Sequence, residues 1–544
     1  MSTKSTDWWR GAVIYQIYPR SFADSNGDGV GDLKGITDKL DYVAALGVDG
    51  IWISPFFKSP MKDFGYDVSS HRDVDPIFGT NDDFDILLAR AHELGLKVVI
   101  DLVLSHTSEE HPWFVESRKD RTNPKADWYV WADPKPDGSP PNNWFSVFGG
   151  SAWQWEPRRQ QYYLHNYLVS QPDVNFHCPA AVDAVMADME YWLQKGVDGF
   201  RFDVVNVYTH DKEMRDNPAR KASDPSFDNI SSNNPYTYQR HLYDKSRPEN
   251  LKILNRMRAL MDKYGASSVG EISDDDSINR AAEYTAGKGR LHMAYNTYML
   301  RDKFGAALVA DGIKLTEAAF TDGWPSWSFG NHDVPRVATR WGGEDPSGGF
   351  LRALLALQLA LRGSVFIYQG EELGLPDVDV PYHLLRDPFG KTFWPEYKGR
   401  DGCRTPMPWI GHAEQAGFTT GQPWLPIPDE HRARAVEVQE ADEGALLHAY
   451  RHMLKWRKTR PELVTGSIRL VGVEEPLIAF TRTYGSTELL VVINLGPSAT
   501  TYNVTDIGAL TPVTDHGLPQ GKQNGNRLEL GGYEVFFATL KKEK

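Results

Sequence analysis

One pattern of hydrophobic and polar positions recurs along the chain: an amphipathic helical stretch ends at a glycine, and a short apolar run then closes on a charged or polar residue. It occurs as LGVDGIWISPFF around Gly47, LGLKVVIDLVLSH around Gly95 and KGVDGFRFDVVN around Gly196. Glycine suits the left-handed cap that stops a helix, and the apolar runs have the length of buried strands. The pattern predicts repeated helix–strand units.

Further apolar runs bring the number of predicted strands to eight. The five further runs are residues 13–18, SSVGEI ending at Glu271, LHMAYNTYM from Leu291, SWSFGNHD ending at Asp333 and SVFIYQGEEL from Ser364. Because helical patterns separate these runs, the sequence predicts an α/β fold, a (β/α)8 TIM barrel, and not a two-layer sandwich.

The spacing of the glycines indicates an insertion after the third strand. The interval from Gly95 to Gly196 is much longer than that from Gly47 to Gly95. We place an inserted subdomain at 107–172, where Trp, Pro, Asn and Gly are frequent, as in an irregular excursion of loops and strands. Two further excursions follow the fourth and eighth strands, at 207–250 and 376–425. We expect all three to crowd the mouth at the carboxyl ends of the barrel strands.

After a helical stretch at 448–458, the pattern changes to short alternating segments. These are SIRLV, LIAFTRTY, ELLVVINL, TYNVT and YEVFFATL, and such alternation is typical of antiparallel strands. We therefore expect a C-terminal antiparallel β-sandwich at 465–544, and we assign 1–106 and 173–464 to the barrel.

The composition is that of a folded globular protein. Of the 544 residues, 24% are charged and 41% are hydrophobic, and the formal net charge is −14. No long run of Lys and Arg opposes that balance, which excludes an unspecific nucleic-acid surface.

Cysteine usage and the apolar segments bear on the compartment. Cys178 and Cys403 are too few and too far apart for a disulfide framework, which favours two free thiols in a reducing compartment. The first residues contain no secretory apolar segment, and the best apolar helix candidate, LRALLALQLALRG from Leu351, is interrupted by Arg and Gln. We expect a cytoplasmic protein that neither spans nor binds a membrane.

Three acidic residues end three different predicted strands. In GFRFDVVN, Arg201 and Asp203 share one face of a strand, so we expect the arginine to lower the pKa of Asp203, which suits a nucleophile; a structural ion pair is the alternative. Glu271 has no basic neighbour in the sequence, so it could keep a proton as a general acid; a helix N-terminal acid is the alternative. Asp333 ends a third strand, beside His332.

Such a set at one mouth of a barrel indicates chemistry rather than stability. One ionised and one protonated carboxyl, with a third to bind the substrate, are the minimum apparatus for cleaving a glycosidic bond.

The chain resembles glycoside hydrolase family 13, the α-amylase family, and within it the bacterial α-glucosidases and oligo-1,6-glucosidases. The resemblance is carried, in order, by WWRGAVIYQIYPRSFADSNGDGVGDLKGI, DFGYDV, DLVLSHTS, QPDVNF, GFRFDVVN, GEI, FGNHD, YQGEELG and GRDGCRTPMPW. It implies a retaining, exo-acting α-glucosidase in which Asp203 is the nucleophile, Glu271 the acid/base and Asp333 the stabiliser of the transition state.

The resemblance also implies a pocket for the non-reducing glucosyl unit. Tyr66 would stack under the sugar ring, and Asp63 with Arg400 would close the pocket behind it. The residues implied to bind substrate are Asp63, Tyr66, His106, Phe148, Gln171, Arg201, His332 and Arg400.

The segment DSNGDGVGD has the near-alternate oxygen ligands of a cation loop, although Gly35 stands where an EF-hand has its glutamate. Family members that the chain resembles bind Ca2+ or Mg2+ here, so we expect one structural divalent cation, and no cofactor for the chemistry. A merely solvated acidic turn is the alternative. The expected ligands are Asp24, Asn26, Asp28, Val30 through its carbonyl, and Asp32.

The substrate stays open. In the enzymes that the chain resembles, a valine at the position of Val204 goes with α-1,6 preference, whereas the loop 208–250 looks more like that of α-1,4 enzymes. Maltose, sucrose and isomaltose are all candidate partners, and disaccharides are expected to be better substrates than polymers. The alternatives on the same fold are a sucrose isomerase, a trehalose synthase, a dedicated α-glucosyltransferase and a hydrolase of trehalose 6-phosphate. A catalytically inactive carbohydrate-like module is disfavoured, because all three carboxylates are present.

Overall fold

The computed structural model describes residues 7–224, 230, 233–343 and 347–541. Parts of the predicted excursion 207–250, namely 225–229 and 231–232, lie outside the described residues, as do 1–6 and 344–346 of the predicted barrel and 542–544 of the predicted sandwich.

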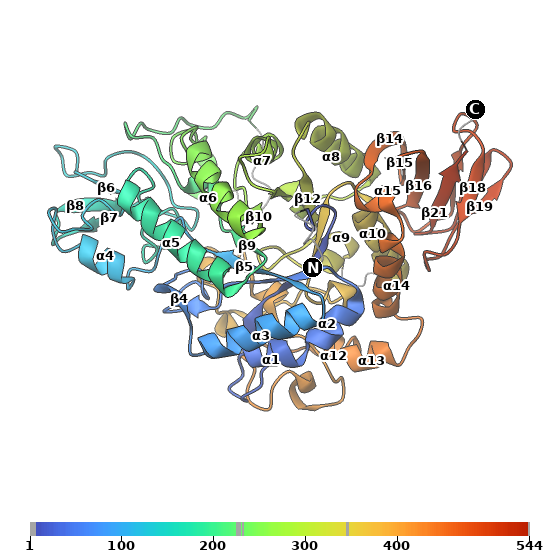
Figure 1. The fold of residues 1–544 in the computed structure, drawn as a ribbon, viewed down its shortest axis with the longest axis horizontal. Helices are drawn as coiled ribbons and strands as arrows, with labels where there is room; N and C mark the ends of the chain where they lie inside the picture. Colours follow the sequence, from blue (N-terminus) through green and yellow to red (C-terminus); the bar gives the residue numbers. More distant parts are fainter. Residues whose placement is uncertain (1–6, 225–229, 231–232, 344–346, 542–544) are drawn as a thin grey trace.

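Eight parallel strands close into a barrel in the order β1-β13-β12-β11-β10-β9-β5-β2 (Figure 1). Every strand predicted for the barrel is present, so the predicted TIM barrel is confirmed. The strands are β1 (Val13–Ile17), β2 (Gly50–Ile53), β5 (Lys97–Leu102), β9 (Gly199–Phe202), β10 (Ser267–Gly270), β11 (Met293–Asn296), β12 (Pro325–Ser328) and β13 (Ser364–Tyr368).

Helices surround the barrel and bury their apolar faces against it (Figure 1). The glycines after α2 and α5, Gly47 and Gly196, have φ values of 91° and 101°, so the predicted left-handed caps are confirmed. The helices are α1 (Leu33–Asp38), α2 (Leu40–Leu46), α3 (Asn81–Glu93), α5 (Pro179–Lys195), α6 (Asn250–Tyr264), α7 (Ser277–Thr285), α8 (Ala306–Ala319), α9 (Val337–Gly342), α10 (Gly348–Ala360), α12 (Asp429–Ala433), α13 (Val436–Glu440), α14 (Leu446–Lys458) and α15 (Pro461–Val464).

The chain leaves the barrel between β5 and α5, as predicted for an insertion after the third strand. This segment holds a three-stranded antiparallel sheet in the order β6-β8-β7, and it lies at the end of the molecule opposite the C-terminal domain (Figure 1). Trp144, Trp153 and Leu164 belong to its own small core. Its elements are α4 (Pro112–Ser117), β6 (Trp131–Ala132), β7 (Trp153–Glu156) and β8 (Gln161–Leu164), and β3 (Phe57–Lys58) pairs with β4 (Ser70–Val74) in a hairpin after β2.

The C-terminal region is a two-sheet antiparallel domain, as predicted. One sheet has the order β14-β15-β16-β21-β18 and the other β17-β20-β19, and apolar side chains of both sheets share one core. The strands are β14 (Ser467–Glu474), β15 (Leu477–Tyr484), β16 (Thr487–Asn494), β17 (Thr500–Asn503), β18 (Leu510–Val513), β19 (Lys522–Asn524), β20 (Arg527–Leu530) and β21 (Val535–Leu540).

A buried arginine fastens this domain to the barrel. Arg482, on β15, donates from Nη1 to the carbonyl oxygens of Ala360 and Leu361 at 2.6 and 2.8 Å, at the C-terminal end of α10. Burial lowers the pKa of Arg482 well below its usual range, and the nearby guanidinium groups of Arg457 and Arg362 lower it further. The contact joins two regions that are far apart in the sequence.

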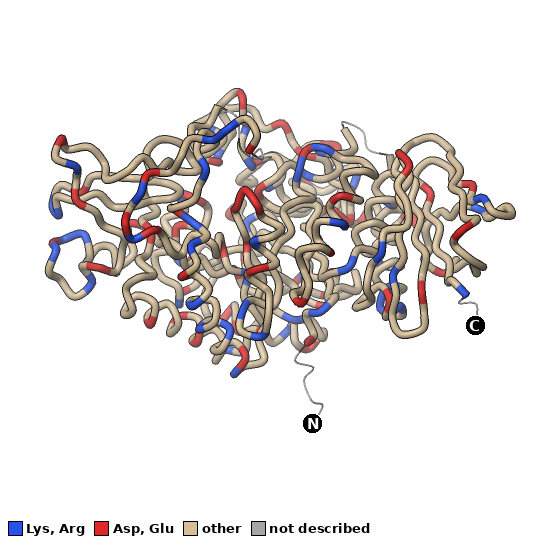
Figure 2. The backbone as a smooth tube through the Cα atoms, turned by 90° about the horizontal axis from the view of Figure 1, so that it is seen from above, with Lys and Arg blue, Asp and Glu red and all other residues tan. Residues whose placement is uncertain are grey.

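Lys and Arg residues alternate with Asp and Glu residues along the backbone (Figure 2), which agrees with the absence of a basic run in the sequence. None of the helices in the described ranges is long and apolar enough to cross a membrane.

Candidate active site

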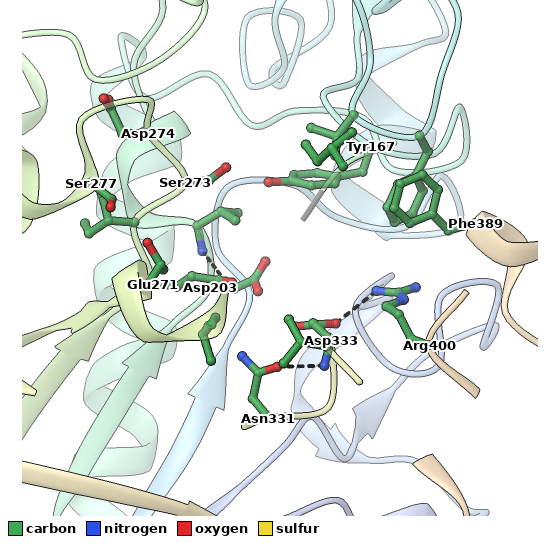
Figure 3. Close-up of a pocket in the computed structure, with 18 of the residues that line it drawn as sticks. Tyr167, Asp203, Glu271, Ser273, Asp274, Ser277, Asn331, Asp333, Phe389 and Arg400 are labelled. Carbon is green, nitrogen blue, oxygen red and sulfur yellow. Dashed lines mark hydrogen bonds and ion pairs between the residues drawn. The ribbon is translucent and has the colours of Figure 1, made fainter. Parts of the chain in front are cut away.

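A cavity of about 270 Å3 opens at the carboxyl ends of the barrel strands (Figure 3). Asp203 follows β9, Glu271 follows β10, and Asp333 lies in the turn after β12. The cavity walls include all three of these carboxylates and five of the predicted substrate-binding residues: Asp63, Tyr66, His106, Phe148 and Arg400.

Arg201 connects the carboxylates at the floor of this cavity. Its side chain is buried, with Nη1 2.7 Å from Asp203 Oδ1 and 2.9 Å from Asp101 Oδ1, and Nη2 2.6 Å from Glu271 Oε2. Glu271 has no basic neighbour in the sequence, but Arg201 lies beside it in the fold. The neighbour comes from the next strand, because Val269 of β10 pairs with Arg201 of β9.

Burial has the largest effect on the pKa values of Asp203 and Glu271. It raises the pKa of Asp203 to about 7, with Arg201 opposing the rise and the carboxylate of Asp101 adding to it. The predicted lowering of the pKa of Asp203 is thus wrong, because desolvation outweighs the ion pair. Burial also raises the pKa of Glu271 to about 7, the direction predicted for a general acid. The two carboxyls titrate as a pair and share protons near neutral pH.

The backbone is strained at the residue that follows Asp203. Val204 has φ 34° and ψ 51°, a left-handed conformation that is rare for a β-branched residue. In this conformation its backbone N–H donates to Glu271 Oε2 at 3.3 Å. The strain therefore places a donor between the two carboxyls.

The third carboxylate faces two guanidinium groups. Asp333 Oδ1 lies 3.2 Å from Nη1 of Arg400 and 3.0 Å from Nη2 of Arg404. Burial raises the pKa of Asp333, but the neighbouring basic groups lower it by more, so the net shift is downward. Because burial lowers the pKa of His332 to about 3, the histidine is neutral and the arginines carry the lowering. Asp333 is therefore ionised at neutral pH.

Tyr66 lines another wall of the cavity, and its ring stacks on His332 behind it. The rings of Tyr66 and His332 have centroids 5.3 Å apart and are inclined by 5°, and the Tyr66 hydroxyl is 2.6 Å from His332 Nε2. His332 Nδ1 accepts from Gln16 Nε2 at 2.8 Å, so Nε2 carries the proton and donates to Tyr66. The Tyr66 hydroxyl in turn donates to Asp101 Oδ2 at 3.0 Å. This chain of bonds fixes the tautomer of His332.

The end of the cavity beyond Asp333 is closed by an ion-paired cluster. Arg400 Nη2 lies 2.9 Å from Asp63 Oδ1 and 2.8 Å from Asp387 Oδ1, and Gln171 Nε2 donates to Asp63 Oδ2 at 3.1 Å. The Phe148 ring stacks on Phe389 with centroids 4.8 Å apart. The inserted subdomain and the third excursion therefore meet over this end of the cavity.

Three predicted substrate-binding residues stand behind the cavity surface rather than on it. These are Gln171, Arg201 and His332, and each bonds a residue that does line the cavity.

Sequence reasoning missed several residues of this site. Asp101 is a fully buried carboxylate within β5, and an aspartate inside an apolar strand run, VIDLVLSH, was a usable signal. Asp387 caps α11 (Pro388–Phe393) in the third excursion, where nothing local distinguishes it from an ordinary helix cap. Tyr167 and Phe389, which line the cavity, and Arg404, which binds Asp333, were missed for the same reason, because only the folded excursions bring them to the site.

The predicted cation ligands lie together on the loop after β1. The side-chain oxygens of Asp24, Asn26, Asp28 and Asp32 each accept a backbone N–H bond of that loop, at 2.6–2.9 Å. Each oxygen has a second lone pair, so the all-oxygen donor set suits Ca2+ or Mg2+ chemically. Within the described ranges, no group of three or more His, Cys, Asp or Glu side chains converges to hold a metal ion. A cation here would therefore depend on Asn26 and the Val30 carbonyl as well.

Comparisons with known proteins cover nearly the whole chain. The model of the alpha-amylase catalytic domain matches residues 16–466. A protein described as a probable alpha-glucosidase, from Rhizobium meliloti (strain 1021), is 51% identical over 538 residues, which covers 98% of this chain and 97% of that protein. The solved structure of an alpha-glucosyl transfer enzyme is 54% identical with a TM-score of 0.96 and covers 98% of this chain and 99% of that one. The isomaltulose synthase of Protaminobacter rubrum is 30% identical with a TM-score of 0.89, at 98% and 99% coverage.

Proposed function

Because the chain belongs to the alpha-amylase family, we propose that it is a retaining, exo-acting α-glucosidase that removes the non-reducing terminal α-glucosyl unit from short substrates such as maltose, sucrose and isomaltose. The observation that carries the proposal is the buried Arg201, whose two terminal nitrogens bind Asp203 and Glu271 beneath a cavity that is closed at one end.

In the proposed first step, Asp203 attacks the anomeric carbon while Glu271 protonates the leaving oxygen, which gives a β-linked glucosyl ester on Asp203. A water that is deprotonated by Glu271 then displaces Asp203 and restores the α configuration. The elevated pKa of Glu271 supports the acid role, since a proton is available near neutral pH. When protonated Glu271 donates a hydrogen bond to the leaving oxygen of a bound substrate, the shared proton stays on Glu271. Asp203 is then the ionised member of the pair. A separation of roughly 5 to 5.5 Å between the two carboxyls stays a prediction.

The ionised Asp333 would stabilise the positive charge that develops at the anomeric carbon. Asp63 and Arg400 would bind the distal hydroxyls of the glucosyl unit. Because they and the Phe148–Phe389 stack close that end of the cavity, a chain cannot extend past the unit that is cut. This closure supports exo action and a preference for disaccharides.

A second candidate function differs only in the second step. The alpha-glucosyl transfer enzyme and the isomaltulose synthase share the fold over nearly their full lengths, and their names describe glucosyl transfer and the synthesis of isomaltulose, not hydrolysis. In such a step a sugar or another alcohol replaces water as the nucleophile.

The experiment that tests the proposal is a product time course by NMR with maltose, sucrose and isomaltose in parallel. Release of α-glucose before its mutarotation supports a retaining α-glucosidase. Release of β-glucose would contradict it, and accumulation of an isomer or a new glucoside without free glucose would favour the transfer function.

We further propose that one structural divalent cation binds the loop with Asp24, Asn26, Asp28, Val30 and Asp32, away from the reacting atoms. The loop packs on the third excursion, where Thr419 Oγ1 donates to Asp24 Oδ2 at 2.5 Å, so the cation would stabilise that contact. The two free thiols support a reducing, cytoplasmic location, which cell fractionation would test.

A further inference from the structure

Tyr167 of the inserted subdomain brings a hydroxyl to the cavity that the proposed mechanism does not use. Its backbone carbonyl accepts from Ser146 Oγ at 2.6 Å and lies 3.0 Å from His165 Nδ1. Its ring packs edge-on against Phe148, with centroids 5.7 Å apart, and at a tilt of 48° against His106, with centroids 5.2 Å apart. The ring is therefore held from several sides.

The Tyr167 hydroxyl, by contrast, has no hydrogen-bond partner among the residues that the structure describes, although the ring lines the cavity. In Figure 3 it points toward Ser273 and the Asp203–Glu271 pair, and away from Phe389 and Arg400. Burial raises the pKa of Tyr167 well above its usual range, and the nearby carboxylates of Asp203 and Glu271 raise it further.

The two ends of the cavity differ, and the Tyr167 hydroxyl points toward only one of them. The end at Asp63 and Arg400 is closed and would bind the glucosyl unit, so the leaving group and later the acceptor enter from the opposite side. That side is lined by the loop after Glu271, with the hydroxyls of Ser273 and Ser277, and by Thr297. The Tyr167 hydroxyl therefore faces the position of the acceptor.

We propose that Tyr167 is a specificity-determining residue for the acceptor: its hydroxyl hydrogen-bonds a second, non-attacking hydroxyl of a polyhydroxylated acceptor and so favours transfer over hydrolysis. This inference rests on the proposed glucosyl-enzyme. In the transfer step the attacking acceptor oxygen bonds to the anomeric carbon, the ester bond to Asp203 breaks with its electrons returning to that carboxylate, and the acceptor proton goes to Glu271. Tyr167 takes no part in these bond changes.

The test compares two acceptors with one donor. With p-nitrophenyl α-glucoside as donor, nitrophenol release measures formation of the glucosyl-enzyme, free glucose measures hydrolysis, and the difference measures transfer. Glycerol offers a second hydroxyl to Tyr167, whereas 1-propanol offers none. Tyr167→Phe removes one oxygen atom and keeps the ring, so it leaves the packing against Phe148 and His106 in place.

We expect Tyr167→Phe to lower the ratio of transfer to hydrolysis about fivefold with glycerol, the effect of one hydrogen bond, and to leave the ratio with 1-propanol unchanged. The matched control is Tyr163→Phe, whose buried hydroxyl donates to the Val169 carbonyl at 2.8 Å outside the cavity lining. Equal changes with both acceptors, or no change with glycerol, would overturn the inference. Absence of nitrophenol release from the unsubstituted protein would instead refute the proposed function.

Discussion

Replacing Asp203 with asparagine separates what this carboxyl does for catalysis from what it does to stability. Asparagine has nearly the same shape and keeps an oxygen for Arg201, whose guanidinium retains Asp101 and Glu271 as ionic partners. The proposed nucleophile is lost, so turnover should be abolished. The buried negative charge is lost as well, and the structure predicts that the fold then becomes more stable.

The magnitude follows from the pKa of Asp203, which burial raises from 3.8 to about 7. A carboxyl with a higher pKa in the folded state binds its proton more tightly there, so it destabilises the fold increasingly as the pH rises from about 4 to about 7. At about 1.4 kcal/mol for each pH unit, the full loss is about 4 kcal/mol above pH 7 and roughly 2 kcal/mol at pH 5. With roughly 2.1 cal/mol/K of unfolding entropy per residue, about 4 kcal/mol raises the Tm of this chain by about 3.5 °C.

The assay is thermal unfolding of the Asp203→Asn and unsubstituted proteins between pH 5 and pH 8, read by differential scanning calorimetry. The increase in Tm should be largest at pH 8 and should shrink as the pH falls. Because Glu271 shares protons with Asp203, Glu271→Gln should show the same pH trend and serves as a second variant. A Tm that falls at pH 8, or a shift that does not depend on pH, would refute the reasoning that desolvation outweighs the Arg201 ion pair. Retained turnover in Asp203→Asn would refute the nucleophile assignment.

Three other perturbations test separate parts of the structure. Arg400→Met removes an ionic partner of Asp63, Asp387 and Asp333, so it should lower the free energy of unfolding by roughly 3 to 5 kcal/mol. It should also lower kcat/KM for maltose by about a hundredfold, and an unchanged kcat/KM would contradict the assignment of the closed end to the glucosyl unit. Removing divalent cations with EDTA should lower the Tm, with Ca2+ or Mg2+ restoring it, and should do so less in an Asp28→Ala variant; an EDTA-insensitive Tm would contradict the cation proposal. Arg482→Met leaves the Ala360 and Leu361 carbonyls unpaired and should lower the free energy of unfolding by about 2 to 4 kcal/mol. The value of kcat/KM measured well below the Tm should stay unchanged. An unchanged stability would show that the contact between the barrel and the C-terminal domain does not depend on this arginine.

The barrel could be predicted because its signals are local. An apolar run bounded by a helix-ending glycine needs only neighbouring residues to be recognised, and the left-handed φ of Gly47 and Gly196 is what such an ending requires. The positions of Asp203 and Glu271 followed from the same logic, since the residue after a parallel barrel strand lies at the mouth. Asp333 was predicted to end its strand, but β12 already ends at Ser328, and the turn that follows brings Asp333 to the same mouth.

Interactions across strands could not be read from spacing. Arg201 binds Glu271 because β9 pairs with β10 in one register, and Asp101 joins them because β5 pairs with the other side of β9. The pKa of Asp203 then depends on how far the whole site is removed from water, and desolvation reverses the direction expected from the Arg201 pair alone.

The sequence by itself therefore determined which strands exist and which carboxylates stand at their ends, because these depend on residues within a few positions of one another. The tertiary structure decided how those carboxylates are charged, which arginines bind them and which aromatic side chains close the cavity over them. The excursions that carry Tyr167, Phe389 and Asp387 are irregular, so their side chains reach the site only through packing between segments that are distant in the sequence.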